Sequence, residues 1–110
     1  MDISQVVRFT KIPRALMDAL IQTRLSGTQL RVILWVIHHT FGWHRQWTPF
    51  TWYGIAEDLD ADRAGVYRAG CALLKDGVLV EHMGRLAVQM HLAVWDRGSL
   101  NIALPPNNCE

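Results

Sequence analysis

The stretch from Thr51 to Val80, TWYGIAEDLDADRAGVYRAGCALLKDGVLV, constrains the fold of this chain more than any other. Its apolar residues recur at helical spacing in two blocks, the first around Ile55 and the second around Val66. Asp62 is placed to accept a backbone N–H at the start of the second helix, and Gly77 is placed to end that helix before a strand begins. Two helices joined by so short a turn are typical of a helix-turn-helix, whose second helix can lie in the major groove of DNA.

Two further helices are predicted upstream. Pro13 suits the first turn of a helix because its missing N–H costs nothing there, and this helix runs roughly to Arg24. The S-x-x-Q pattern at Ser26 matches a capping box, which opens a strongly apolar helix over roughly residues 28–40, ended by Gly42. We expect this helix to be buried on most sides, or to face a second subunit. The stripe expected to be buried in the first helix contains Leu16, Met17, Leu20 and Ile21.

The C-terminal part of the chain predicts a β-hairpin. Segments 79–82 and 86–95 read as strands, and the second of them alternates with period two. Residues 83–85 form the tight connection between them. Upstream, Pro49 cannot donate to a ladder, so a short strand there is expected at a sheet edge.

These elements together predict an α+β fold that is mostly α, a winged helix-turn-helix with a short C-terminal β-hairpin as its wing. With 110 residues, the chain is long enough for one domain. We place this winged-helix domain, with an N-terminal arm, at residues 1–96, and an irregular tail at residues 97–110.

Composition narrows the range of functions. Half of the residues are hydrophobic and 19% are charged, which argues against disorder. The formal net charge of +1 gives only weak support to DNA binding, which usually accompanies a clear basic excess. No apolar run approaches membrane-spanning length, and no signal peptide precedes the fold. We expect no membrane association, a cytoplasmic protein, and reduced thiols at Cys71 and Cys109.

No catalytic or cofactor site stands out. The five histidines do not combine with cysteines at the spacing of a zinc site. Nothing resembles a nucleophile with its base, a pair of catalytic carboxylates or a glycine-rich phosphate loop. We therefore expect no enzymatic activity, no cofactor and no metal.

Residues 9–46, FTKIPRALMDALIQTRLSGTQLRVILWVIHHTFGWHRQ, resemble the start of the bacteriophage replication protein O family, the origin-binding initiators of lambda-like phages. The most specific part is the T-[YF]-G-W ending, present here as residues 40–43. The helix-turn-helix is similar too, since Ile55-Ala56 and Val66-Tyr67-Arg68-Ala69 sit where such domains carry Leu-Ala and Val-x-Arg-Ala. The usual glycine of the corner is Asp60 here. The resemblance covers roughly residues 8–95.

The resemblance implies sequence-specific binding of double-stranded DNA at a replication origin, in the bacterial host cell or its nucleoid. Full-length initiators of this kind continue into a segment that recruits the helicase machinery. A replication protein, or another phage or host protein, is therefore a further expected partner. This chain ends soon after the wing, so we expect either a cut domain or a chain that has lost that role.

The candidate DNA-reading face is the outer side of the second helix of the helix-turn-helix. An arginine there can read a guanine edge or clamp a phosphate, whereas a lysine serves as a point charge. Arg85 at the hairpin tip is the only cation of the wing and can touch one phosphate. An ordinary solvated helix face is the competing interpretation. The residues of the face are Arg63, Ala64, Tyr67, Arg68, Cys71 and Lys75.

The charge distribution keeps two alternatives open. Residues 51–80 carry five acidic and three basic side chains, whereas residues 1–50 carry six basic and two acidic ones. Phosphate attraction supplies most non-specific affinity, so the acidic corner opposes DNA binding. The alternatives are a winged-helix protein-interaction module without DNA binding and a stand-alone phage transcriptional regulator. The five tryptophans, together with the two-fold symmetry of many DNA sites, favour a homodimer.

Overall fold

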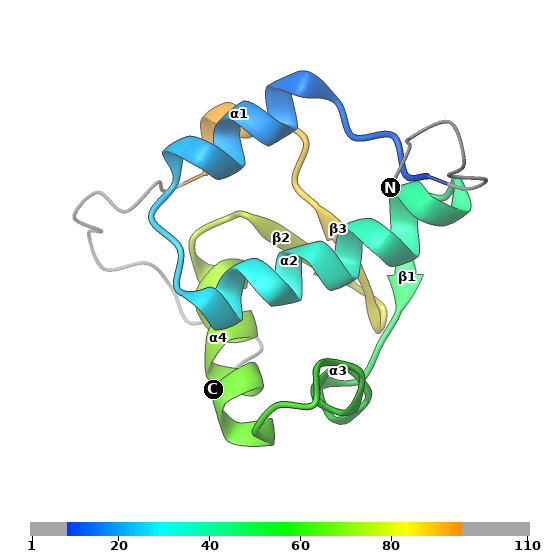
Figure 1. Cartoon of the computed structure of the whole chain (residues 1–110), viewed down its shortest axis with the longest axis vertical. Helices are drawn as coiled ribbons and strands as arrows, with labels where there is room; N and C mark the ends of the chain where they lie inside the picture. The colour runs from blue at the N-terminus through cyan, green and yellow to red at the C-terminus, as the bar shows by residue number, and fades with distance from the viewer. Residues whose placement is uncertain (1–8, 96–110) are drawn as a thin grey trace, which may run out of the picture.

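Helix α2 crosses the middle of the molecule, and the other elements surround it (Figure 1). The computed structural model describes residues 9–95, so the N-terminal arm before Phe9 and the tail at 97–110 lie outside the described residues. The fold is α+β and mostly helical, as predicted. Its elements are α1 (Arg14–Gln22), α2 (Gly27–Thr40), η2 (Phe41–Trp43), β1 (Thr48–Pro49), α3 (Trp52–Leu59), α4 (Arg63–Lys75), β2 (Leu79–His82), β3 (Arg85–Val88) and η3 (Leu92–Val94), where η marks a 3-10 helix.

The three strands form one antiparallel sheet in the order β1-β3-β2. Strand β1 is an edge strand, which confirms the position predicted from Pro49. Strands β2 and β3 form the expected hairpin, with Leu79 opposite Val88 and His82 opposite Arg85. Four helices with a small antiparallel sheet of this kind are compatible with a winged helix.

The second strand of the hairpin is shorter than predicted. It begins at Arg85 and ends at Val88, although the alternating pattern continues beyond it. Its partner β2 begins at Leu79, so the ladder has no further residues to pair, and the last bond of this kind joins Gln89 N–H to the Val78 carbonyl at 2.9 Å. The chain then turns into η3, and the buried Trp95 donates its indole N–H to the Gln89 carbonyl at 2.8 Å.

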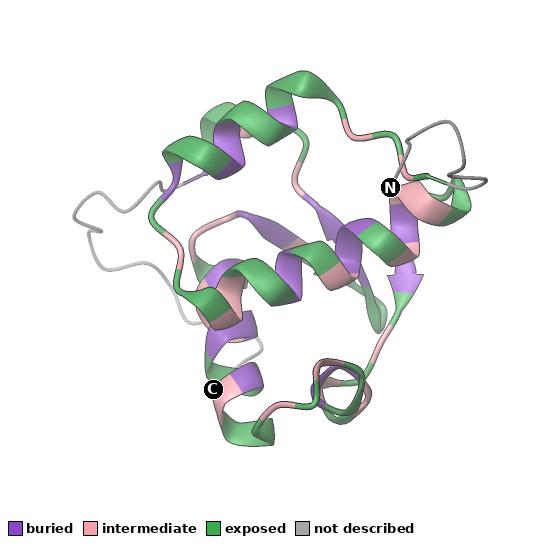
Figure 2. Ribbon diagram, viewed as in Figure 1, coloured by how far each residue is buried: buried purple, intermediate pink, exposed green. Residues whose placement is uncertain are grey.

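The buried stripe of α1 is narrower than predicted. Leu16, Ala19 and Leu20 are buried, and Figure 2 shows the buried positions of α1 on the side turned toward α2 and the sheet. Met17 is 41% exposed and Ile21 is 74% exposed, so both were wrongly assigned to the core. The helix is only nine residues long and lies on one side of the domain, so it covers its neighbours with one stripe.

Helix α2 supplies much of the core. The predicted capping box at its start is present, because Ser26 accepts from Gln29 N–H at 3.1 Å and Gln29 accepts from Ser26 N–H at 2.9 Å. The expected stop at Gly42 is wrong, since Gly42 lies inside η2 and His44 takes the left-handed conformation, with φ 54°. The residues of α2 that are buried are Val32, Ile33, Val36, Ile37 and Thr40, whereas Leu30 and Leu34 remain exposed.

Candidate nucleic-acid interface

Helices α3 and α4 meet at a corner (residues 51–75) whose local signals all act as predicted. Thr51 caps α3 by accepting from Gly54 N–H at 2.9 Å, and Asp62 caps α4 by accepting from Gly65 N–H at 2.8 Å. Asp60 ends α3 in the left-handed conformation, with φ 51°. Aspartate tolerates this conformation better than most side chains, which explains how it stands where glycine is usual in the resembling family.

Close packing holds the two helices of the corner against each other. A Cβ atom added at Gly70 would lie 2.2 Å from the Trp52 ring, so no larger residue fits without moving that ring. Gly65, by contrast, faces open space apart from ordinary contact with Asp62. Ile55 and Val66 lie completely buried behind this contact. The glycine at position 70 therefore reflects a close helix–helix approach rather than a soft helix.

The outer face of α4 is exposed as predicted. Arg63, Ala64, Tyr67, Arg68 and Lys75 are exposed, whereas Val66, Ala69, Gly70 and Leu73 are buried. The exposed positions recur every three to four residues, so they form one face of the helix opposite its core stripe. Cys71, which also belongs to this row, is half-buried. Cys109 lies outside the described residues, so the expectation of reduced thiols stays a prediction.

The structure adds Tyr53 to this interface, a residue that the sequence reasoning missed. The Arg63 guanidinium lies 4.7 Å from the centre of the Tyr53 ring, and Tyr53 is 51% exposed. Tyr67 meets Trp52 edge to face, with ring centres 6.2 Å apart. These side chains line a shallow hollow between the starts of α3 and α4. The available signal was a tyrosine in the first turn of the helix that Thr51 caps.

Arg85 is exposed at the first position of β3, beside the hairpin turn. Met83 and Gly84 form that turn, with φ values of 53° and 77°. Two consecutive positive φ values are the mark of a type I′ hairpin turn, which favours glycine, asparagine or aspartate at both places. The structure therefore confirms a tight turn but moves Arg85 out of it and into the strand.

The acidic residues of the corner serve the fold. Asp62 and Asp60 act at helix ends, as described above, and Asp58 accepts the indole N–H of Trp35 at 2.8 Å. Asp62 also lies beside the positive end of α4, where a carboxylate is stabilising. The sequence predicted the cap at Asp62, but neither the role of Asp60 at the end of α3 nor the bond that ties α3 to α2 through Asp58 and Trp35.

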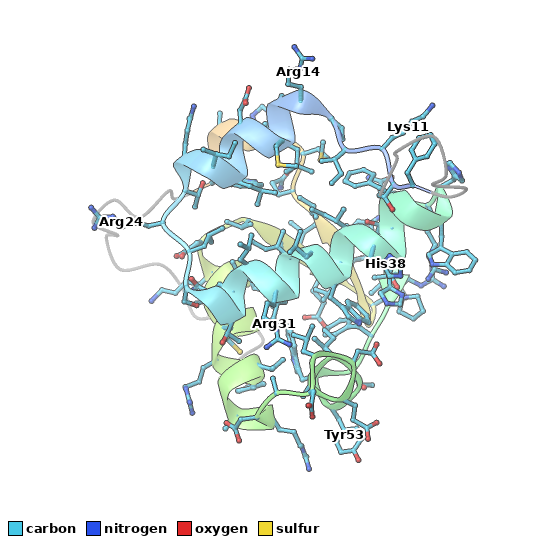
Figure 3. The ribbon with its side chains drawn as sticks, viewed as in Figure 1. Lys11, Arg14, Arg24, Arg31, His38 and Tyr53 are labelled. Atoms are coloured by element: carbon cyan, nitrogen blue, oxygen red, sulfur yellow. The ribbon has the colours of Figure 1, made fainter. Side chains whose placement is uncertain are left out.

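The basic residues between Phe9 and Phe50 divide into two groups. Arg31 donates to the Leu59 carbonyl at the end of α3, and Arg45 donates to the His39 carbonyl at 2.8 Å. These two arginines hold backbone carbonyls in place, so they contribute less to a free basic surface. Three other basic side chains are exposed and point outward around the α1 end of the molecule, away from Tyr53 at the opposite end (Figure 3). They are Lys11, Arg14 and Arg24.

Two histidines near the end of α2 pack in a cluster of rings with Trp35. The His39 ring lies 4.1 Å from Trp35 and 5.0 Å from His38, centre to centre. Burial lowers the pKa of His39 below its ordinary value of 6.5, and His38 and Arg45 lower it further, against the opposing effect of Asp58. Within residues 9–95, no group of three or more His, Cys, Asp or Glu side chains is placed to hold a metal ion.

No helix within the described part of the chain is long and apolar enough to cross a membrane. Comparison with known proteins adds one finding. The sequence model of one protein family, described as bacteriophage replication protein O, matches residues 5–95. This match covers both the T-[YF]-G-W segment and the α3–α4 corner. Searches of curated proteins and of solved structures returned no match.

Proposed function

We propose that this chain binds double-stranded DNA sequence-specifically at a phage replication origin. The chain belongs to the bacteriophage replication protein O family, and the proposal starts from that membership. Family membership gives the chain a role in phage replication with DNA binding. The finer proposal names the element that reads DNA. Helix α4 acts as the second helix of a helix-turn-helix and enters the major groove with its outer face.

The observation that carries this proposal is the exposed row on α4. The row is backed by a buried stripe, and its helix is fixed at the start by the Asp62 cap and in the middle by the Gly70–Trp52 contact. A recognition helix must be held in this way, because base-edge hydrogen bonds tolerate little displacement. Arg68, in the middle of the row, is the residue we assign to a base edge.

The hollow at the start of α4 supports a second kind of contact. Arg63 is held over the Tyr53 ring, which positions a guanidinium at the side of the reading helix rather than at its centre. We assign Arg63 and Tyr53 to a phosphate of the DNA backbone, and Lys75 to another phosphate as a point charge. These contacts set the position of α4 on the duplex, and Arg85 of the hairpin adds one more.

The proposal includes a homodimer, because two-fold symmetric DNA sites are usually bound by two-fold symmetric proteins. It includes no enzymatic activity. Of the five tryptophans in the chain, Trp43 is 64% exposed, whereas Trp95 is buried. Leu34 and Ile21 add exposed apolar surface on α2 and α1. Sedimentation equilibrium of the free protein and of its DNA complex measures this part of the proposal separately from DNA binding.

A protein-interaction module without DNA binding is the second candidate. Glu57, Asp58, Asp60 and Asp62 are all exposed at the corner, close to the proposed reading helix. Such a surface favours a basic protein partner and repels phosphate. A phage transcriptional regulator on the same fold would bind DNA in the same manner, and it differs only in the position of its site in the phage genome.

Fluorescence anisotropy with labelled duplex DNA tests the proposal. We expect binding to random duplex at low salt that weakens steeply as salt rises, because phosphate contacts release counterions. A selected binding site then allows Arg68→Ala to be measured, with an expected loss of about 1–3 kcal/mol. Arg24→Ala at the α1 end is the matched control and should change affinity little. Absence of binding at every salt concentration would favour the protein-interaction module.

A further inference from the structure

The β2–β3 turn carries an apolar side chain that the fold does not use. Met83 is 87% exposed, so its side chain contributes little to the core. Its backbone has a φ of 53°, a conformation that favours glycine, asparagine or aspartate over a long unbranched side chain. Met83 is thus unfavourable for the turn and contributes little to the core. Its position therefore points to a contact with another molecule.

The surroundings of Met83 are apolar and basic. A hollow at the tip is lined by Trp47, His82, Met83 and Arg85, and none of these side chains is acidic. The Trp47 and His82 ring centres lie 6.2 Å apart with the rings tilted at 57°, so two aromatic side chains flank the exposed guanidinium of Arg85. The tip therefore combines an exposed apolar end with a positive charge.

The direction of the β2–β3 hairpin also bears on the role of Met83. Its turn lies toward the end of the molecule that holds α3, and away from α1 (Figure 1). The proposed docking of α4 in a major groove places the duplex at that same end, with the flanking minor groove facing the tip.

We infer that Met83 acts as a wedge that enters the minor groove and partly separates two stacked base pairs, with Arg85 beside it against the groove wall. Methionine is among the side chains that proteins insert between base steps, and an arginine suits the negative potential of a narrow minor groove. The inference rests on the proposed DNA binding. It adds that the bound duplex is kinked and locally unstacked at one step beside the site that α4 reads.

Two variants separate the wedge from the fold. Met83→Asn places a residue that favours positive φ at the tip, so the turn should be retained or strengthened while the wedge is lost. Met83→Leu keeps an apolar side chain at the same place. Met90→Asn is the matched control, because Met90 is also exposed but lies outside the hairpin turn. Thermal unfolding of each variant confirms that the fold is intact.

The measurement uses the selected duplex with 2-aminopurine placed at successive steps beside the site, and a second duplex labelled at both ends for energy transfer. Wild type, M83L and M90N should raise 2-aminopurine fluorescence at one step and shorten the end-to-end distance, whereas M83N should bind without either change. Equal unstacking and bending by M83N would overturn the wedge, as would a wild-type complex with straight, fully stacked DNA, and both results leave the proposed function standing. Absence of DNA binding by wild type overturns both proposals.

Discussion

The two ends of this molecule differ in charge and in how firmly their side chains are placed. The α1 end exposes Lys11, Arg14 and Arg24, and α1 begins at Arg14, after Pro13, without a side-chain cap. The opposite end contains the α3–α4 corner, where acidic residues outnumber basic ones between residues 51 and 80. Charge alone would direct DNA to the α1 end, whereas we propose that DNA is bound at the corner.

The two ends therefore differ in how closely their structure is fixed as well as in their charge. At the corner, Asp62 caps a helix, Asp58 binds Trp35, and Gly70 brings Trp52 close, so each element is held in one position. A sequence-specific interface needs that precision. The exposed cations of the α1 end can increase long-range attraction to DNA, but no comparable set of contacts fixes them within residues 9–95.

The largest effect is expected from breaking the fixed geometry of the corner. Gly70→Ala places a methyl group against the Trp52 ring and should reduce the free energy of unfolding by about 1–3 kcal/mol, as overpacking does. Gly65→Ala in the same helix meets open space and should increase it by up to about 1 kcal/mol. Urea unfolding measures both. Equal stability of the two variants would contradict the close helix–helix contact.

Smaller effects are expected from two substitutions that remove the same negative charge at the corner but differ in whether they also remove a helix cap. Asp60→Gly removes an acidic side chain from a left-handed position, so it should raise the free energy of unfolding by up to about 1 kcal/mol and also strengthen DNA binding. Asp62→Ala removes the same charge but also the α4 cap, at a cost of about 0.5–2 kcal/mol. Unfolding and anisotropy measured on both variants give the comparison. Weaker DNA binding by D60G would show that this carboxylate belongs to the recognition surface.

The smallest expected effect is on the pH dependence of stability. It concerns His39, which lies at neither end of the molecule. The pKa of His39 is lowered in the folded protein, mainly by burial, so the unfolded chain takes up a proton first as the pH falls. The stability that depends on the neutral ring is therefore complete above the ordinary pKa of 6.5 and is lost below it. His39→Gln should reduce the decline in stability between about pH 7 and pH 5.5. An unchanged decline in this variant would assign it to other groups.

Local signals made the ends of several helices predictable. The caps at Ser26, Thr51 and Asp62 and the stop at Gly77 depend on hydrogen bonds or backbone angles within a few residues, which sequence displays directly. The exposed face of α4 followed from the same short-range reasoning, because one buried stripe defines the opposite side of a helix.

Features that depend on distant partners were not predictable. Ile21 and Leu16 are equally apolar in the sequence, and only the position of α1 on the domain decides which of them is covered. The end of β3 at Val88 depends on where β2 begins. Tyr53 belongs to the candidate interface because the packing of α3 against α4 places its ring under Arg63. The spacing of residues within one helix does not reveal such a contact between two helices.

One measurement tests most directly whether DNA is bound at the corner rather than at the more basic α1 end. It compares the affinity for selected duplex DNA, across a salt series, of two double variants that each remove two positive charges. The variants are R63A/R68A at the corner and K11A/R14A at the α1 end, each first shown to unfold like wild type. We predict a loss of sequence-specific affinity in R63A/R68A and only a modest change in K11A/R14A. The opposite result, with specific binding lost in K11A/R14A and retained in R63A/R68A, would contradict the account.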